Sequence, residues 1–495
     1  MNFPYLSAIL LLPIIGLIVI ALLPKPEQRT IKLTALVFAL ASFALSVAVF
    51  CLFDRSGAAI GQIQFEEKLS WIPAINAFYH LGVDGLSLPM VILMTFLGVL
   101  AVLVSWNIQL RPKEYFIWLL LLEASILGVF CSLDLVLFFL FWELELIPMY
   151  FLISVWGGGR REYSAIKYVI YTLVGSAMML AGILSIYFTA GSLNMIELAG
   201  LDVARPFIPL SAMFFLMLIG FAIKLPVFPL HTWLPDAHTD APTAASVILA
   251  GALLKMGGYG MIRLCVTIFP GVALQFAPLL VALAAVSVLY GAAVTLRQKD
   301  LKRLIAYSSV SHMGYVLLGV FALSQVSLTG AVLQMFSHGI ITGLLFAMVG
   351  LVYDKAHERN LDNLGGLARQ MPVIVVVFSI AGLASLGLPG TSGFAAEFIT
   401  FVGSYSSTVV DGVRLYTILG VFGIVLTAGY ILWMLQRVFY GPPLEKFNGV
   451  PDANNVEKVC IFSFVAAIML VGLYPAILTD VIKVGVEPIM RLVGS

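Results

Sequence analysis

Residues 220–230 read Gly-Phe-Ala-Ile-Lys-Leu-Pro-Val-Phe-Pro-Leu, so an apolar run contains Lys224 two residues before Pro226. Proline has no backbone N–H and its ring clashes with the preceding turn, so we expect a helix to break at Pro226. A charged side chain inside an apolar helix is costly, and such residues usually have a partner and a function. The stretch therefore predicts a buried, interrupted helix that holds a lysine at its break.

The composition around this stretch is that of a membrane protein. The chain is 61% hydrophobic and 11% charged, whereas soluble domains are about 45–50% apolar and about 25% charged. Apolar runs of roughly 18 residues, long enough to cross a bilayer, recur along the whole sequence. Because isolated strands leave backbone groups unpaired in hydrocarbon, we expect each run to be a helix. The net charge of +1 gives no reason to expect a nucleic acid partner.

The apolar runs predict an all-α polytopic membrane protein with about fourteen transmembrane helices. Their expected starts are near residues 4, 32, 83, 114, 133, 165, 208, 242, 273, 302, 328, 372, 414 and 459. Most of the 27 lysines and arginines fall in the loops that follow odd-numbered helices. Basic loops stay in the cytoplasm, so both termini are predicted on the outer side of the membrane.

A second apolar stretch has the same features as the first. Residues 384–393 read Ala-Ser-Leu-Gly-Leu-Pro-Gly-Thr-Ser-Gly, with Glu397 shortly after Pro389. The two interrupted helices would be the seventh and the twelfth, and such pairs are typical of inverted-repeat transporters. The alternative is that the prolines only bend packed helices. The pattern predicts three N-terminal helices, a first five-helix repeat (helices 4–8), a second repeat (helices 9–13) and a last helix, at residues 1–106, 107–266, 267–440 and 441–495.

Ionisable side chains lie where the centre of the bilayer should be, although each charge there costs about 2.5–3.5 kcal/mol. A buried ion pair can fix helix register without transporting anything. These residues are, however, spread over seven of the expected helices and alternate in type, which favours a lateral path for protons. They are Glu123, Glu143, Glu145, Lys224, Lys255, His312, His338 and Glu397.

The chemistry of these groups suits proton transfer. Burial favours neutral lysine and a carboxylate within about 4–6 Å favours the ammonium, so movement of Glu143 relative to Lys224 would load and unload the lysine. Glu145 lies some 200° around a regular helix from Glu143, so both cannot face one partner, and a structural role is equally open for it. Histidines relay protons near neutral pH, although His312 and His338 could instead make helix–helix hydrogen bonds.

The sequence offers no basis for a cofactor or metal in this chain. Its four cysteines are dispersed, and it contains no CxxC, no GxGxxG and no phosphate-binding loop. If a redox reaction is involved, its cofactors belong to other chains.

Several motifs resemble those of one family, the antiporter-like membrane subunits of NADH–quinone oxidoreductase (complex I), over roughly residues 80–440. Glu397, where related subunits carry lysine, and the chain length make it similar to subunit M, called chain 4 in organellar nomenclature. The motifs are Phe141-Trp-Glu-Leu-Glu-Leu-Ile-Pro-Met-Tyr150, Lys224-Leu-Pro226, His231-Thr-Trp-Leu-Pro-Asp-Ala-His238, Ala241-Pro-Thr-Ala244, Leu249-Ala-Gly-Ala-Leu-Leu-Lys255, Leu301-Lys-Arg-Leu-Ile-Ala-Tyr-Ser-Ser309 and Ser311-His-Met-Gly314.

The resemblance implies a proton-pumping translocase subunit driven by electron transfer to quinone in partner subunits, which would hold the flavin and the iron–sulfur clusters. It implies that Glu143 and Lys224 form a charge pair on the proton-uptake side and that Lys255 is a central relay. His312 and His338 would be two further relay residues, Glu397 a carboxylate near the exit and Glu123 an adjacent carboxylate on the fourth helix. For the polar residues between His231 and Asp240, we favour capping and loop hydrogen bonds.

The resemblance also implies partners and a location. We expect homologous antiporter-like subunits on either side, surrounding lipids, and a bacterial inner membrane or a cyanobacterial thylakoid, with both termini periplasmic or lumenal. Three alternatives remain open: a subunit of a multi-chain sodium/proton antiporter, a cyanobacterial variant that uses ferredoxin and is coupled to carbon dioxide uptake, and a scaffold that has lost transport.

Overall fold

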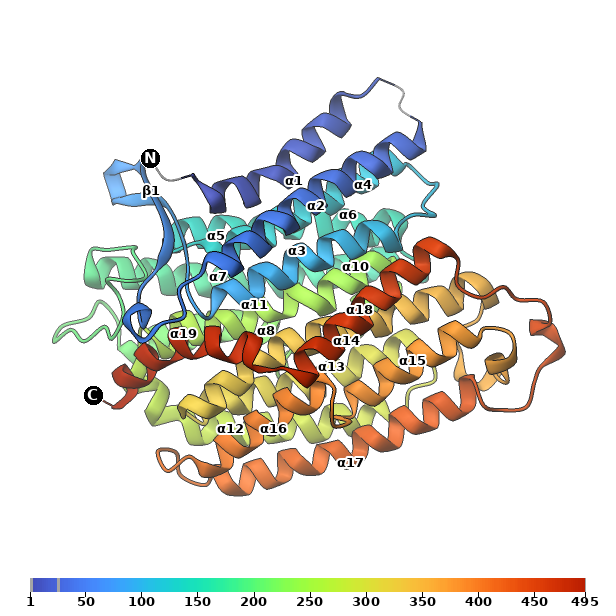
Figure 1. The fold of residues 1–495 in the computed structure, drawn as a ribbon. Helices are drawn as coiled ribbons and strands as arrows, with labels where there is room; N and C mark the ends of the chain where they lie inside the picture. The colour runs from blue at the N-terminus through green and yellow to red at the C-terminus, as the bar shows by residue number, and fades with distance from the viewer. Residues whose placement is uncertain (1–2, 25–26, 495) are drawn as a thin grey trace.

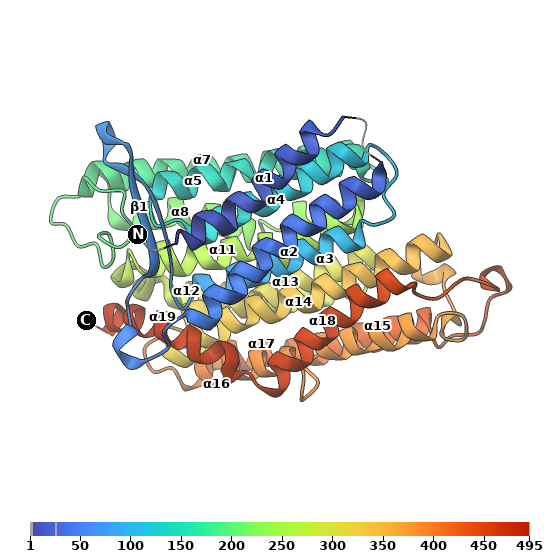
Figure 2. The ribbon, with the colours of Figure 1, turned by 45° about the horizontal axis from the view of Figure 1, so that its top comes forward.

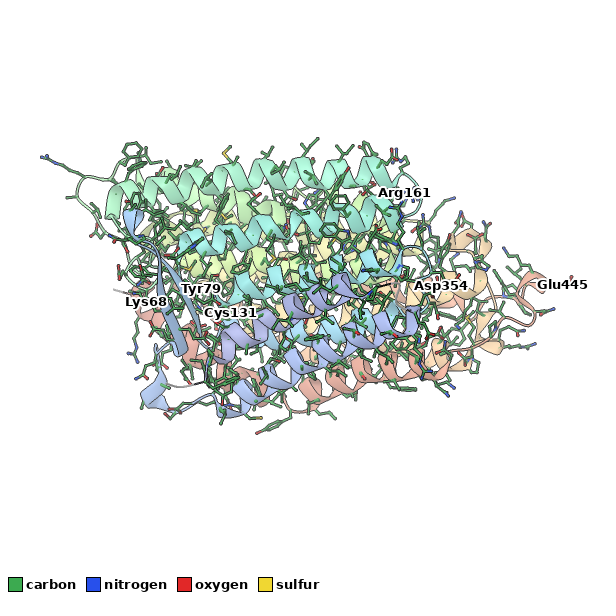
Figure 3. All side chains as sticks on the ribbon, turned by 90° about the horizontal axis from the view of Figure 1, so that it is seen from above. Lys68, Tyr79, Cys131, Arg161, Asp354 and Glu445 are labelled. Atoms are coloured by element: carbon green, nitrogen blue, oxygen red, sulfur yellow. The ribbon has the colours of Figure 1, made fainter. Side chains whose placement is uncertain are left out.

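The computed structural model describes residues 3–24 and 27–494, which are mostly helical. Most helices run side by side along one long direction, and the two ends of the described chain lie at the same end of the body (Figure 1). Figure 3 shows Lys68 and Tyr79 at that end, and Arg161, Asp354 and Glu445 at the other. Lys68 and Arg161, predicted on opposite sides of the membrane, therefore lie at opposite ends of the molecule.

Twelve helices of the described chain are long and apolar enough to cross a membrane, so this is a multi-pass membrane protein. Ten of them are single helices: α1 (Tyr5–Leu22), α2 (Gln28–Leu52), α3 (Ser87–Val104), α4 (Pro112–Cys131), α7 (Arg161–Ala190), α12 (Pro270–Thr295), α13 (Leu301–Phe321), α14 (Gln325–Ala356), α17 (Val413–Val438) and α18 (Asn455–Leu473). Two shorter apolar helices, α8 (Leu210–Lys224) and α15 (Pro372–Ser385), begin near the predicted starts of spans seven and twelve.

The other two long spans are composite. One consists of α5 (Leu135–Leu144) and α6 (Leu146–Trp156), which meet at Glu145. The other contains α10 (Thr243–Ile248), a π-helical segment (Leu249–Leu253), α11 (Leu254–Gly260) and a second π-helical segment (Met261–Val266). π-helical turns widen the helix and are frequent at functional sites. The sequence pattern predicts only regular helices here, because hydrophobic periodicity does not distinguish a single wide turn.

Two helices are interrupted in mid-body. α8 ends at Lys224, and α9 (Trp233–Asp240) follows an irregular segment that contains Pro226. α15 ends at Ser385, and α16 (Ser392–Ser406) follows a turn that contains Pro389. Within this second turn, Gly387 and Gly390 have φ angles of +82° and +91°, a backbone region that favours glycine.

The end that carries the chain termini is covered by two elements that the sequence did not predict. A hairpin of β1 (Gln64–Ile72) and β2 (Ala77–Val83) forms an antiparallel pair there, and α19 (Ala476–Gly494) follows α18 (Figure 2). A Glu67 oxygen accepts a hydrogen bond of 2.8 Å from the backbone N–H of Leu6 and so holds the start of α1. Short 3-10 turns lie in the connections, at Gly57–Ala59, Pro73–Ile75, Leu361–Asn363, Leu367–Arg369 and Glu445–Phe447.

A buried ion pair ties this covering layer to the helices. The Asp84 carboxylate lies 2.5 Å from an Nη atom of Arg263, and both side chains are about one-tenth exposed. Asp84 also accepts hydrogen bonds from the backbone N–H groups of Leu86 and Ser87, at the start of α3. Arg263 stays inside the protein, because Asp84 satisfies its charge there.

We expect Asp84→Asn to destabilise the protein by about 3–5 kcal/mol, because it leaves the buried guanidinium of Arg263 without a counter-charge. The measurement is the thermal unfolding midpoint of the purified protein. The matched control is Asp480→Asn, which removes an exposed ion pair with Lys483 at the same end and should change stability by less than about 1 kcal/mol. Equal midpoints for the two variants would contradict a structural role of the buried pair.

Candidate functional site

The charged and titratable residues singled out in the sequence lie inside the helical body. Six of the seven predicted relay residues are 4% exposed or less, and the seventh, Glu143, is half-buried. The six buried residues are Glu123, Lys224, Lys255, His312, His338 and Glu397.

Lys224 is held at the broken end of α8. It is the last residue of that helix, where the partial negative charge of the helix terminus favours a cation. Its ammonium forms an ion pair with the carboxylate of Glu145. The Tyr168 hydroxyl on α7 donates to the other Glu145 oxygen at 2.6 Å and lies 3.4 Å from the Lys224 nitrogen. All three side chains are buried, so the pair is satisfied entirely by protein groups.

This pairing corrects one expectation, since Glu145 and not Glu143 is the partner of Lys224. α5 ends at Leu144 and α6 begins at Leu146, because Pro148 lacks the N–H that would bond to the Leu144 carbonyl. Glu145 lies at this junction and contacts Tyr168 of α7 and Lys224 of α8. Pro148 was the signal in the sequence that could have predicted the junction.

Glu143 remains close to the same lysine. It interacts electrostatically with Lys224 and Glu145 and lies beside Ser176 on α7. One of its carboxylate oxygens is buried without a hydrogen-bond partner among the described residues. Lys224 therefore has two carboxylates in its surroundings, one in contact and one free to accept a hydrogen bond.

Lys255 occupies the centre of the body, on the wide helix. Its ammonium donates to the Ala250 carbonyl, in the π-helical segment, and lies 2.8 Å from Nδ1 of His338 on α14. A π-helical turn changes the backbone pairing and so makes this carbonyl available to a side chain. The described residues place no carboxylate in ion-pair contact with Lys255, so its nearest titratable partner is an imidazole.

A row of contacts continues from Lys255 to Glu397. The rings of His338 and His312 have centroids 5.7 Å apart, and His312 Nδ1 lies 3.2 Å from a Glu397 oxygen on α16. Ser385, at the end of α15, lies 3.3 Å from the other nitrogen of His312. The two histidines, Ser385 and Glu397 line a small cavity between these helices. Nε2 of His338 has no partner in the described structure, and such buried polar atoms usually bind water.

The two clusters meet where α11 packs against the broken end of α8. Gly257, two residues after Lys255, lies against the backbone of Phe221 and Leu225, and a Cβ there would be 2.6 Å from the Leu225 nitrogen. Only glycine permits this approach. The pair at Lys224 and the row that begins at Lys255 are thus held on adjoining backbone segments.

Glu123 lies apart from both clusters. A Cβ added at Gly98 of α3 would be 2.5 Å from the Glu123 carboxyl carbon, so the glycine makes room for this carboxyl group. One Glu123 oxygen is buried without a hydrogen-bond partner in the described part of the chain. Among the described residues, Glu123 forms no ion pair, whereas Lys224 and Glu397 each form one.

The polar segment after the first break is helical as α9, and its residues differ in role. Asp236 lies 2.6 Å from the Lys167 nitrogen, and Asp240 accepts a hydrogen bond of 2.6 Å from Ser164, so these carboxylates join α9 to α7. The ring nitrogens of His231 and His238 have no partners among the described residues. The expected hydrogen bonding therefore holds for the two aspartates, and also for Thr232 and Thr239, but not for the two histidines. The described residues contain no cluster of His, Cys, Asp and Glu that could hold a metal ion.

The chain is similar to known membrane subunits. The family model described as "NADH:quinone oxidoreductase/Mrp antiporter, TM" matches residues 132–427. An NAD(P)H-quinone oxidoreductase chain 4 of Synechococcus elongatus is 43% identical, over 100% of this chain and 93% of that protein. NADH-quinone oxidoreductase subunit M of Rhodobacter capsulatus is 40% identical, over 98% and 96%. A chain of Thermus thermophilus respiratory complex I with bound NADH superimposes with a TM-score of 0.88 at 29% identity, over 99% and 100%.

Proposed function

Because the chain belongs to the family of antiporter-like membrane subunits of NAD(P)H–quinone oxidoreductase (complex I), of the subunit M or chain 4 type, we propose that it moves protons across the membrane through its buried side chains. Electron transfer to quinone in partner subunits would drive this movement. The flavin and iron–sulfur clusters would belong to those partners, with NADH or ferredoxin as the electron donor. Homologous antiporter-like subunits would lie on either side, in a bacterial inner membrane or a thylakoid.

The observation that supports the proposal is the row Lys255–His338–His312–Glu397. Lys255 Nζ lies 2.8 Å from His338 Nδ1, and His312 Nδ1 lies 3.2 Å from a Glu397 oxygen. The two histidine rings between them have centroids 5.7 Å apart. A neutral imidazole accepts a proton on one nitrogen and donates from the other, so the two histidines, with water in the cavity between them, would carry a proton from the lysine to the carboxylate. Glu397 also lines a groove at the surface between α16 and α17, which gives the row an end near the outside of the chain.

Lys224 would be the switch of the first cluster. In contact with Glu145 its ammonium is favoured, and without that contact burial favours the neutral amine. We propose that residues 107–266 and 267–440 act as two inverted repeats, each with one broken helix. Movement at the first break would change the contact of Lys224 and so release a proton towards Lys255. Glu143 would serve as the alternate partner of the lysine, and Glu123 as a further carboxylate of the uptake side.

The test uses inverted membrane vesicles that contain the assembled complex. Quinone reduction and proton uptake are measured together with the electron donor that the membranes oxidise. The proposal requires proton uptake that depends on quinone reduction and that variants of Lys224 and Lys255 lose. Sodium-driven proton exchange without quinone would instead indicate the multi-chain antiporter, and unchanged pumping in both variants would indicate a scaffold.

We expect Glu145→Gln and Glu143→Gln both to lower the number of protons pumped per electron, but to differ in stability. Glu145→Gln removes the partner of a buried ammonium and should destabilise the complex by about 3–5 kcal/mol. Glu143→Gln removes no ion pair and should leave the unfolding midpoint unchanged. Normal pumping in either variant, or an equal loss of stability in both, would contradict the two-partner arrangement.

A further inference from the structure

His238 is a buried imidazole that the row just described does not use. It lies on α9 with 0% of its side chain exposed, and neither ring nitrogen has a hydrogen-bond partner among the described residues. Its ring stacks on Phe346 of α14 with centroids 4.4 Å apart and an angle of 8° between the planes. An apolar aromatic ring would make the same stack without the cost of two unpaired polar atoms, which is about 1–3 kcal/mol for a buried group. Packing therefore does not account for a histidine here.

The position of His238 relates it to the central lysine. His238 interacts electrostatically with both Lys255 and His338. On α14, residues 338, 342 and 346 are each four apart and so share one face. The Thr342 hydroxyl lies 3.4 Å from Nδ1 of His338, and His238 stacks on Phe346 one turn further along. His238 thus extends the row of polar groups beyond His338, towards the C-terminal end of α14.

That end of α14 is the end predicted to face the cytoplasm. Asp354, near the end of α14, lies together with Arg161 at the end of the body opposite the termini (Figure 3). Lys302, at the start of α13, is also near His238 and donates to the Ala241 carbonyl at 2.7 Å. His238 is therefore placed between the charged groups of this end and the central lysine.

From this placement we propose that His238 is the imidazole through which protons pass from the cytoplasmic end to Lys255. The inference rests on the proposed pumping function and adds the side from which the central lysine is loaded. In one step, a water-borne proton binds one ring nitrogen, and the proton on the other nitrogen passes through water to the neutral amine of Lys255. The products are a Lys255 ammonium and a neutral imidazole in its other tautomer, and exchange of the ring protons with water returns the imidazole to the starting tautomer.

Electrostatics gives this step an order. Lys302 and Lys255 both interact electrostatically with His238, so an imidazolium there is repelled by both lysines while Lys255 is charged. His238 can therefore carry a proton only after Lys255 has passed its own proton to His338. The route then admits one proton per cycle and resists backflow, because the charged lysine closes it.

The test compares His238→Phe and His238→Gln in the assembled complex, in inverted vesicles. Phenylalanine keeps the stack on Phe346 but cannot carry a proton, and glutamine keeps hydrogen-bonding groups but cannot relay one. General acid–base groups accelerate proton transfer by about 10²–10⁴-fold, so both variants should lower the protons pumped per electron to the value of Lys255→Ala. The exposed His357, replaced in His357→Gln, is the matched control and should pump normally.

The outcomes separate this inference from the proposed function. Normal pumping in His238→Phe would overturn the inference, because the stack alone would then suffice. Failure of both His238 variants to assemble would also overturn it, since the residue would be structural. Normal pumping in Lys255→Ala, measured in parallel, would instead overturn the proposed function. Loss in Lys255→Ala with normal pumping in both assembled His238 variants would leave the function standing and remove only this route.

Discussion

Lys224→Ala is expected to abolish most of the proton pumping of this subunit while the complex still assembles. Without the ammonium, the Glu145 carboxylate keeps only the Tyr168 hydroxyl as a hydrogen-bond donor in a fully buried site. A lone buried charge is so costly that the carboxyl group takes up a proton and becomes neutral. The site then lacks the amine whose charge changes during turnover, and the proton-transfer step through it should slow by about 100-fold or more.

The measurement is proton uptake against quinone reduction in inverted vesicles, after the amount of assembled complex has been determined. Lys224→Met, which fills the volume of the lysine stem, should behave like Lys224→Ala, so a cavity is not the cause of the loss. Lys483→Ala replaces an exposed lysine at the end that carries the termini and should pump normally. Normal pumping in an assembled Lys224→Ala complex would remove Lys224 from the proton path.

The sequence predicted which residues lie inside the body because the relevant signals are local. Proline excludes a regular helix at its own position, so the interruptions around Pro226 and Pro389 could be placed from the chain alone. Charges within long apolar runs have no route to water, so Lys224, Lys255 and Glu397 were expected to be buried. These properties depend on each residue and its near neighbours in the chain.

The partners of those residues were harder to predict, because they depend on how separate helices meet. The helix junction at Glu145 follows from Pro148, but the contact of Glu145 with Lys224 also requires α8 to lie alongside. The partner of Arg263 is Asp84, which is 179 residues distant in the chain, so no local pattern identifies it. The stack of His238 on Phe346 joins α9 to α14 and has no sequence signal of its own.

The arrangement implies two kinds of titratable centre with different means of control. Lys224 has carboxylates near it, so its charge follows the distance to Glu145 and Glu143. Lys255 contacts a carbonyl and an imidazole instead, so its charge depends on whether His338 accepts or returns a proton. A movement at the break of α8 can therefore change the first lysine directly, and the second responds through the proton that it receives.

Lys255→Arg is expected to lose pumping as completely as Lys255→Ala, although arginine keeps the positive charge. A guanidinium can donate to the Ala250 carbonyl and to His338, but it does not release its proton in proteins. If Lys255 passes a proton to His338 in each cycle, the permanent cation blocks the step, and the row to Glu397 carries nothing. The measurement is protons pumped per electron in assembled complexes of both variants. Pumping at the wild-type ratio in Lys255→Arg would show that a fixed charge suffices at this position, and that no proton passes through the side chain.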